Sequence, residues 1–190
     1  MANSYEIDLY GIKRTLPLIP IDDKTAFASF VIISDTELIS RAAGELIKKI
    51  GDVDVLVTAE AKGIALTYEM SRQLGMKDFI VARKGIKNYM RNYIGVEVNS
   101  ITTAGTQHLY LDEADADKVR GRRVCLVDDV ISTGESIHAI DELVKKSGGN
   151  VVCRAAVLVE GGAAARKDIV FLQKLPLFRK NAAGEYEPMN

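Results

Sequence analysis

Residues 122–140 read RRVCLVDDVISTGESIHAI and combine a hydrophobic run, two adjacent acids, a turn of small residues and a helical pattern. The run at 122–130 predicts a central strand. Apolar residues at helical spacing predict a helix over Ser136–Lys146. A turn rich in Ser, Thr and Gly between strand and helix presents backbone N–H groups at a helix N-terminus, which favours binding of an anion.

The residue types of this turn suit a phosphorylated sugar. Hydroxyl donors stand at Ser132, Thr133 and Ser136, and Gly134 lets the backbone approach an anion closely. The acids Asp128 and Asp129 would repel a phosphate, so we expect them one group away, accepting hydrogen bonds from sugar hydroxyls. An ordinary helix N-cap preceded by solvated acids would account for the same residues. The turn alone therefore leaves both interpretations open.

Strands and helices alternate along the rest of the chain, and most strands are near-continuous apolar runs. This pattern predicts an α/β fold with a mainly parallel central sheet flanked by helices. Helices are expected at 36–50, with Asp35 or Thr36 as N-cap, and at 64–74. Further strands are expected at 53–58, 79–83, 107–112 (an edge strand), 150–160 and 168–178.

A long polar stretch, residues 84–106, interrupts this alternation. Loops of this length inside a compact domain are uncommon unless they cover or bind a ligand, so we expect a flexible lid. Part of it, GVEVNSI at 95–101, is a candidate for a β-ribbon.

Composition limits the class of protein. The chain has 190 residues, 47% hydrophobic and 27% charged, with a formal net charge of −1, which predicts one domain over 1–190 and disfavours nucleic acid or lipid as a partner. The N-terminus lacks a secretory pattern and no apolar run is long enough to cross a membrane, so we expect a cytoplasmic protein. The last ten residues indicate a polar tail at about 180–190.

Cysteine and histidine do not indicate a metal site. Cys125 and Cys153 lie inside apolar runs and are expected to be buried thiols. His108 and His138 do not complete a zinc site by spacing, and we expect them to be structural or exposed.

Three segments carry a resemblance to a known family. The order of a hydrophobic strand, DD, three residues, TG, one residue and Ser resembles the donor-binding signature of type I phosphoribosyltransferases. The loop TAEAKGI at 58–64 is similar to the pyrophosphate loop of adenine phosphoribosyltransferases, with Lys62 where arginine is common. VARKG at 81–85 resembles the strand end that supplies basic contacts to pyrophosphate. Together these segments cover about residues 50–160.

The resemblance implies the type I fold, with a small hood to which residues 1–35 contribute. It implies transfer of ribose 5-phosphate from 5-phosphoribosyl 1-diphosphate (PRPP) to a purine base, with Mg²⁺ as cofactor and a homodimer as assembly. The expected catalytic residues are Asp128 and Asp129. The expected 5′-phosphate contacts are Ser132, Thr133, Gly134, Glu135 and Ser136. The expected pyrophosphate contacts are Glu60, Ala61, Lys62, Gly63, Arg83 and Lys84. The candidates in the lid are Lys87, Arg91 and Glu97, the last as a general acid or simply a solvated charge.

The base is adenine or a 6-oxopurine such as xanthine, hypoxanthine or guanine. In 6-oxopurine enzymes a lysine follows the strand after the donor motif, whereas this chain has Glu160 and two glycines there. The loop at 58–64 also favours adenine, while SITTAGT at 100–106 resembles xanthine phosphoribosyltransferases. Phe27 or Phe30 is a candidate to stack on the base, and a core role explains either residue equally well. Glu160 is a further base-binding candidate.

Two other classes of function are open. A non-catalytic regulator of the same fold would keep the donor site, although the residues before position 50 show no helix-turn-helix and no basic stripe. An unrelated nucleotide-binding module is disfavoured because neither the P-loop pattern nor G-x-G-x-x-G occurs.

Overall fold

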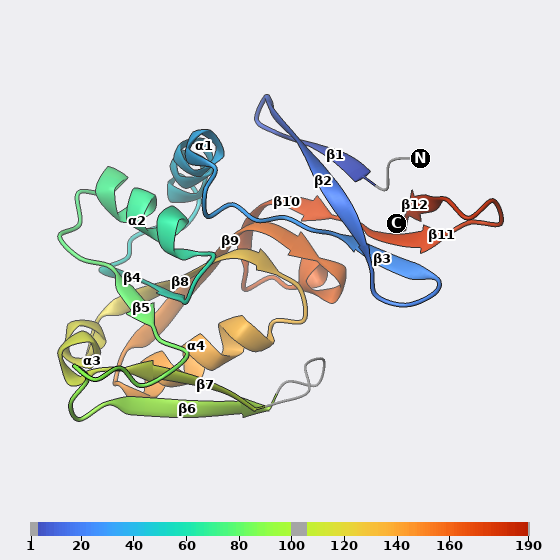
Figure 1. Cartoon of the computed structure of the whole chain (residues 1–190). Helices are drawn as coiled ribbons and strands as arrows, with labels where there is room; N and C mark the ends of the chain where they lie inside the picture. Colours follow the sequence, from blue (N-terminus) through green and yellow to red (C-terminus); the bar gives the residue numbers. More distant parts are fainter. Residues whose placement is uncertain (1–3, 100–105, 190) are drawn as a thin grey trace.

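The computed structural model describes residues 4–99 and 106–189. Its centre is a sheet of five parallel strands in the order β10-β9-β8-β4-β5 (Figure 1). The bounds of these strands are β4 Val55–Ala59, β5 Ile80–Ala82, β8 Arg123–Ile131, β9 Asn150–Glu160 and β10 Val170–Leu175. The strand that carries the two adjacent acids, β8, is therefore central, between β9 and β4.

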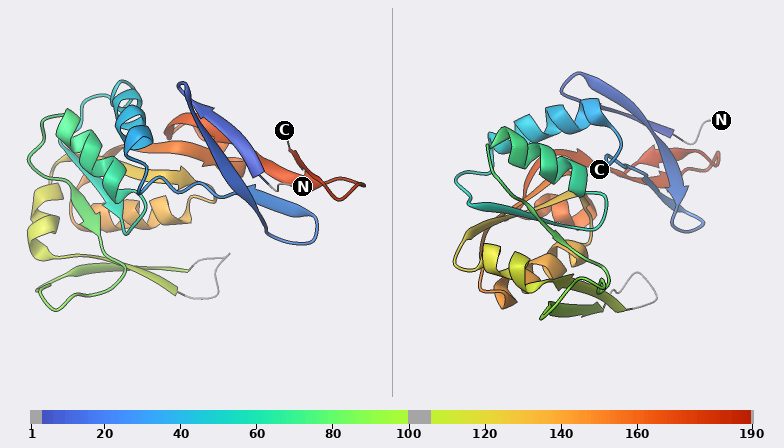
Figure 2. Two further views of the ribbon diagram at one scale, coloured as in Figure 1. Left: turned by 45° about the horizontal axis from the view of Figure 1, so that its top comes forward. Right: turned by 60° about the vertical axis from the view of Figure 1, so that its left-hand side comes forward.

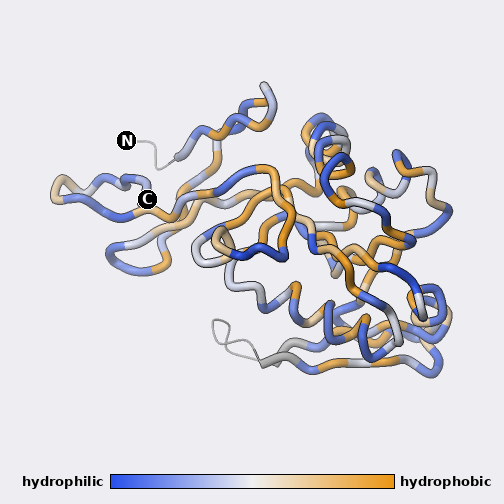
Figure 3. Tube along the Cα trace, turned by 180° about the vertical axis from the view of Figure 1, so that it is seen from behind, coloured by the Kyte–Doolittle hydropathy of each residue, from blue (hydrophilic) through white to orange (hydrophobic). Residues whose placement is uncertain are grey.

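Helices cover both faces of this sheet, α1 and α2 on one and α3 and α4 on the other (Figures 1 and 2). Their bounds are α1 Thr36–Ile47, α2 Ile64–Gln73, α3 Glu113–Val119 and α4 Glu135–Lys146, and a short 3-10 turn, η1, spans Gly161–Ala165. Alternate residues of β8 serve the two faces: Cys125 and Val127 join the core beneath α1 and α2, whereas Val124 and Leu126 join the core beneath α4. Burial on both faces explains the continuous apolar run. Figure 3 shows hydrophobic residues along the central strands and mainly hydrophilic residues in the outer connections.

A second, antiparallel sheet forms the hood, in the order β1-β2-β3-β11-β12. Its strands are β1 Ser4–Leu9, β2 Ile12–Pro20, β3 Thr25–Ala28, β11 Leu177–Lys180 and β12 Tyr186–Pro188. The first strand of the chain, β1, and the last, β12, both lie in this hood (Figure 1). Arg14 of β2 ties it to the rest of the domain, because its guanidinium donates to Asp35 at 2.6 and 2.9 Å and Asp35 also caps α1 by accepting from Leu38 N.

The C-terminal part corrects two expectations. The segment 168–178 was expected to form one strand, but β10 pairs with β9 in the central sheet and β11 pairs with β3 in the hood. The break falls at Pro176, which has no N–H for a ladder. The expectation of a polar tail at 180–190 was wrong for Tyr186–Pro188, which pair with β11, and the carboxamide oxygen of Asn181 accepts from two backbone N–H groups in the turn between them.

The expected ribbon in the lid region is confirmed as β6 Ile94–Asn99 paired antiparallel with β7 Thr106–Leu111. The segment 107–112 was expected to be an edge strand, but within the described residues β7 pairs in the ribbon and is joined to the end of β5 by an isolated bridge between Tyr110 and Arg83. Lys146 of α4 donates to the carbonyl oxygen of Gly95 at 2.8 Å and so holds the ribbon against the helix.

Other local expectations are confirmed. Asp35 is the N-cap of α1, and the helix ends at Ile47, three residues before the predicted end. Cys125 and Cys153 are buried free thiols on adjacent strands. Among the described residues, no helix is long and apolar enough to span a membrane.

Candidate functional site

Asp128 and Asp129 lie in the last part of β8, where the strand turns toward α4. Each carboxylate is tied to the chain that follows it: Asp129 N donates to Asp128 Oδ1 and Val130 N donates to Asp129 Oδ1, both at 2.9 Å. Asp129 is 1% exposed, and its Oδ2 atom accepts no hydrogen bond within the described residues. A buried carboxylate oxygen without a donor is costly, and this one indicates a place for a ligand.

The charge of this acid pair is set by burial and by one lysine. Burial, reinforced by the neighbouring charge of Asp129, raises the pKa of Asp128 to about 7, and Lys62 lowers that pKa in part. The Lys62 ammonium lies 3.6 Å from Asp129 Oδ2. Perturbed carboxylates in a cavity are typical of functional sites.

The turn that the sequence predicts to bind an anion follows β8. Gly134 is the N-cap of α4 with φ of +84°, a conformation that glycine adopts readily, and α4 receives no side-chain cap there. The hydroxyl-bearing residues Ser132, Thr133 and Ser136 are exposed, and Glu135 N approaches Thr133 Oγ1 at 3.4 Å. A long helix that begins at an uncapped glycine beside exposed hydroxyls suits a phosphate.

The loop after β4 lies against the same acids. The peptide joining Glu60 and Ala61 is cis, and Gly63 begins α2 as its N-cap. A Cβ atom at Gly63 would collide with Oγ1 of Thr58 and would lie 3.4 Å from Cα of Asp128. Residue 63 therefore packs closely against Thr58 and the backbone of β8, and a side chain there would require Thr58 to shift.

Glu60 organises the basic wall of the site. Its carboxylate accepts from Lys84 N at 3.0 Å and from Arg83 Nη1 at 3.1 Å, and the Lys87 ammonium lies 3.9 Å away. The hydrogen bond from Lys84 N, with help from Arg83 and Lys87, holds the pKa of Glu60 below its usual value. Glu60 therefore stays ionised and anchors the positive side chains that follow β5.

A cavity of about 490 Å³ joins these parts. The predicted site residues that line it are Phe27, Phe30, Glu60, Ala61, Lys62, Lys84, Asp128, Asp129, Ser132, Ser136 and Glu160. The predicted site residues outside its lining are Gly63, Arg83, Lys87, Arg91, Glu97, Thr133, Gly134 and Glu135. The β4 loop, the β8 turn and the hood thus meet in one cleft, which is the arrangement expected at the carboxyl ends of parallel strands.

The hood end of the cavity differs from the basic end. Phe27 is half-buried on β3, whereas Phe30 is 5% exposed and belongs largely to the core. Glu160, at the end of β9, has a buried Oε1 atom without a hydrogen-bond partner among the described residues. Burial raises the pKa of this carboxyl. An aromatic ring and an unpaired carboxyl oxygen therefore lie at this end.

Sequence reasoning missed seven lining residues, namely Ala28, Ser29, Val31, Ala59, Leu109, Val130 and Ala139. Ser29 and Val31 flank Phe30 in the segment that connects the hood to α1, and Val31 remains 53% exposed. The only sequence feature that pointed to Ser29 and Val31 was their position next to the candidate base-stacking residue Phe30. Leu109 comes from the ribbon, and its approach to the cavity depends on packing against α4, which no local pattern reveals.

The lid candidates lie apart from the acids. Lys87 is near Glu60, Arg91 is exposed in the connection before β6, and Glu97 is exposed on β6 opposite His108. The segment 100–106 was compared above with xanthine phosphoribosyltransferases. Residues 100–105 and the side chain of residue 106 lie outside the described part of the chain.

Comparisons with known proteins agree with this geometry. A family model described as a phosphoribosyl transferase domain matches residues 32–184. An adenine phosphoribosyltransferase of Thermotoga petrophila is 40% identical over 110 residues, which are 57% of this chain and 60% of that relative. An adenine phosphoribosyltransferase of Thermotoga maritima is 31% identical over 159 residues, which are 82% of this chain and 87% of that relative.

A solved structure has the same fold. The adenine phosphoribosyltransferase of Thermoanaerobacter pseudethanolicus superposes with a TM-score of 0.69 at 24% identity, covering 84% of this chain and 95% of that one. At this level of identity the likeness shows that the two chains share a fold. This chain belongs to the phosphoribosyltransferase domain family.

Proposed function

We propose that this protein is an adenine phosphoribosyltransferase, which converts adenine and PRPP into AMP and pyrophosphate. The observation that carries the proposal is one cavity in which a buried acid pair lies between a basic loop and a hydroxyl-rich helix N-terminus. A phosphorylated sugar with a pyrophosphate at C1 needs these three environments in this order. Relatives named adenine phosphoribosyltransferases support the choice of base.

The turn after β8 binds the 5′-phosphate and the acids hold the ribose. Backbone N–H groups and the hydroxyls of Ser132, Thr133 and Ser136 donate to phosphate oxygens. Asp128 and Asp129 accept from the ribose hydroxyls. Their negative charge also stabilises the positive charge that develops on the ribose ring as the bond at C1 breaks.

The loop after β4 and the end of β5 neutralise the leaving pyrophosphate. Lys62 and Lys84 line the cavity, and Arg83 is oriented by Glu60 at its edge. Cations fixed in advance beside the leaving group lower the barrier, because negative charge accumulates there in the transition state. Glu60 acts through Arg83 and Lys84 and not on the substrate itself.

The donor set of this site fits Mg²⁺. Asp129 Oδ2 is a buried oxygen without a hydrogen bond, and Mg²⁺ prefers oxygen ligands from one or two carboxylates and from phosphates. An ion at this site would take its other ligands from the substrate and from water. Asp128 and Asp129 are the residues that would hold it, and the bound ion would neutralise pyrophosphate oxygens.

The hood end takes the base. Phe27 offers an aromatic face, and Glu160 offers the unpaired carboxyl oxygen at the position where 6-oxopurine enzymes carry lysine nearby. The 6-amino group of adenine is a donor, which an acceptor at this end satisfies, whereas the O6 atom of a 6-oxopurine needs a donor. This complementarity favours adenine.

The reaction is a displacement at C1 of the ribose. The bond between C1 and the pyrophosphate oxygen breaks, and its electron pair leaves with pyrophosphate. A bond forms between C1 and a ring nitrogen of adenine, and that nitrogen passes its proton to the departing pyrophosphate or to solvent. The protein positions both reactants, excludes water and stabilises charge.

The test is incubation of purified protein with Mg²⁺, PRPP and adenine, xanthine, hypoxanthine or guanine in separate reactions, followed by chromatography of the nucleotides. We expect AMP formation to be fastest. A nucleotide from a 6-oxopurine alone would contradict adenine as the base. PRPP binding without any nucleotide product would identify a non-catalytic regulator and overturn the enzymatic function. In Glu160→Gln we expect a raised KM for adenine and an unchanged KM for PRPP.

The homodimer implied by the family resemblance is part of the proposal. Sedimentation velocity of the purified protein tests it directly. We expect one species at twice the mass of the 20.8 kDa chain. A species of single-chain mass at micromolar concentration would contradict it.

A further inference from the structure

A second, smaller cavity lies beside the phosphate cradle. It has a volume of about 300 Å³, and its lining shares no residue with the larger cavity. The residues that line it are Thr133, Gly134, Glu135, His138, Asp141, Arg154 and Arg166. Three of them belong to the turn assigned to the 5′-phosphate, so side chains here can act on that turn from outside the substrate cavity.

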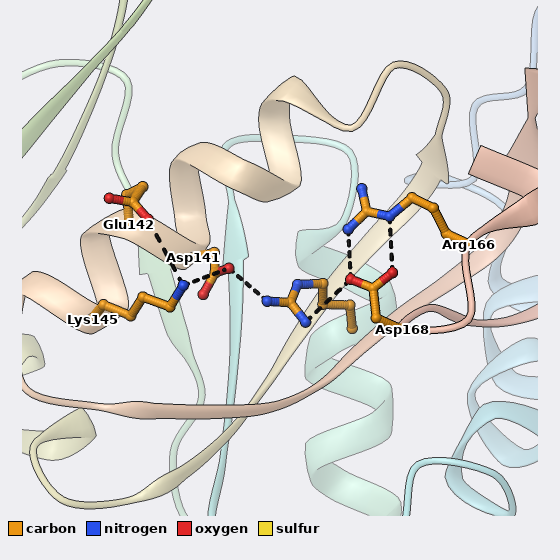
Figure 4. A network of polar contacts seen from close by, with 6 residues as sticks. Asp141, Glu142, Lys145, Arg166 and Asp168 are labelled. Carbon is orange, nitrogen blue, oxygen red and sulfur yellow. Dashed lines mark hydrogen bonds and ion pairs between the residues drawn. The ribbon is translucent and has the colours of Figure 1, made fainter. Parts of the chain in front are cut away.

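Alternating charges run from the body of α4 to this turn (Figure 4). Lys145 and Arg154 both contact Asp141 Oδ2, at 3.2 and 2.6 Å. Arg154 Nη1 also lies 3.4 Å from Asp168, and Asp168 accepts two hydrogen bonds from Arg166, at 3.0 and 2.7 Å. The network links α4 and β9 to the connection between η1 and β10.

The two hydrogen bonds to Asp168 set the orientation of the Arg166 guanidinium. Its Nε and Nη2 atoms are engaged by Asp168, while Nη1 is directed at Gly134. A Cβ atom built on Gly134 would lie 2.7 Å from Nη1. The guanidinium therefore occupies the place that a side chain at the N-cap of α4 would take. Nη1 donates no hydrogen bond within the described residues.

Partial burial strengthens the arrangement. The side chain of Arg154 is 18% exposed and that of Asp141 is 7% exposed, so this end of the network is screened little by solvent. The hydrogen bonds from Arg166 lower the pKa of Asp168 to about 2, which keeps that carboxylate ionised at any physiological pH. A planar guanidinium held by two hydrogen bonds has a fixed orientation.

We propose that Arg166 is a positioning residue for the 5′-phosphate: held by Asp168, it fixes the conformation at Gly134 and places a positive charge behind the cradle. This inference rests on the proposed function, because it takes the cradle as the site of the sugar phosphate. Arg166 sets affinity for the phosphorylated end of the donor and leaves the pyrophosphate end unaffected. It thereby favours ribose 5-phosphate compounds over sugars without the phosphate.

Calorimetric titration of the full chain with ribose 5-phosphate and, separately, with pyrophosphate tests this role. In Arg166→Gln we expect affinity for ribose 5-phosphate to fall roughly tenfold or more, the size of one lost interaction with a charged group. Affinity for pyrophosphate stays within about twofold. In Arg166→Lys we expect a smaller fall in affinity for ribose 5-phosphate. Lysine keeps the positive charge but cannot make the paired hydrogen bonds of the planar guanidinium.

The matched control is Arg120→Gln. Arg120 also makes an ion pair with an aspartate, at 2.9 Å, but on α3, away from the cavity. We expect this variant to bind both ligands as the unaltered protein does. In steady-state assays Arg166→Gln raises KM for PRPP more than it lowers kcat.

Unchanged binding of ribose 5-phosphate by Arg166→Gln would overturn the inference, and so would equal weakening of both ligands, which signals a general loss of structure. Binding of ribose 5-phosphate by the unaltered protein without any turnover would overturn the proposed enzyme alone and leave the role of Arg166 standing. Failure of the unaltered protein to bind ribose 5-phosphate would overturn both.

Discussion

The ammonium of Lys62 lies 3.6 Å from the buried Oδ2 atom of Asp129 and joins the loop after β4 to the acid pair on β8. Its charge lowers the pKa of Asp128 and that of Glu160, although burial raises both. One lysine therefore influences the ionisation of two carboxyls that line the cavity, Asp128 and Glu160.

The acidic limb of the pH–rate profile tests this influence. Asp128 has a pKa of about 7 and must be ionised to stabilise positive charge on the ribose, so kcat/KM falls as the pH drops below that value. In Lys62→Gln the pKa of Asp128 rises, because a cation that lowered it is gone. We expect the midpoint of the limb to move to higher pH.

Lys84→Gln is the control for this shift. Lys84 lines the same cavity but lies on the side of Glu60, so its loss lowers the rate without moving the limb. The measurement is kcat/KM for PRPP across the pH range in both variants. A limb that stays in place in Lys62→Gln would argue against the electrostatic role of Lys62.

The raised pKa of Asp128 also predicts how stability depends on pH. The folded protein binds this proton more tightly than the unfolded chain, whose value is near 3.8. The contribution to the free energy of unfolding is therefore fully present below the unfolded pKa and is lost as the pH rises through about 7. Asp128→Asn removes the charge that forms in that range, so the variant becomes more stable than the unaltered protein on the alkaline side.

Urea unfolding from about pH 5 to about pH 8 measures the difference, which we expect to grow to the order of a few kcal/mol. Asp52→Asn serves as the control, because the Asp52 side chain is 94% exposed and we expect its substitution to change the free energy of unfolding by no more than about 0.5 kcal/mol. A constant difference between Asp128→Asn and the unaltered protein over the same range would rule out the raised pKa.

The close approach of the β4 loop to β8 depends on Gly63. In Gly63→Ala the new methyl group collides with Thr58 Oγ1 and crowds the backbone at Asp128. We expect a loss of about 1–3 kcal/mol of stability, as is typical of overpacking, together with reduced affinity for pyrophosphate. Thermal unfolding and calorimetry measure the two effects.

Gly162→Ala is the matched substitution, because a Cβ atom at Gly162 meets no heavy atom within 4 Å. We expect this variant to keep stability and pyrophosphate affinity. Equal behaviour of the two alanine variants would show that the loop tolerates a side chain at residue 63, contrary to the packing described above.

Local pattern was sufficient to predict the strand, turn and helix that carry Asp128, Asp129 and Gly134, and most elements of the central sheet. One short segment carries Asp128, Asp129 and Gly134, and its strand, turn and helix each have a recognisable local sequence pattern. The apolar run of β8 reflects the burial of that strand on both faces of the sheet. The cavity joins this segment to residues near positions 60 and 160, which the parallel order of β4, β8 and β9 brings to one edge of the sheet, and to residues near position 30 of the hood.

Long-range pairing was not predictable from such patterns. Strand β11 forms by pairing with β3, and β12 forms by pairing with β11. The polar residues of the C-terminal segment do not predict either pairing. The relation of Arg166 to Gly134 likewise depends on a network between α4, β9 and the chain before β10. Residues that meet only through tertiary packing leave no periodic signal in the sequence.

The central claim is that the buried acid pair of β8 acts on the ribose of PRPP in a transferase reaction. The most direct measurement is the rate of AMP formation from adenine, PRPP and Mg²⁺ by the unaltered protein and by the double variant Asp128→Asn, Asp129→Asn. We expect the unaltered protein to turn over and the variant to lose about 100-fold or more in kcat while remaining folded by thermal unfolding. Full activity in the folded variant, or no AMP from the unaltered protein, would contradict the claim.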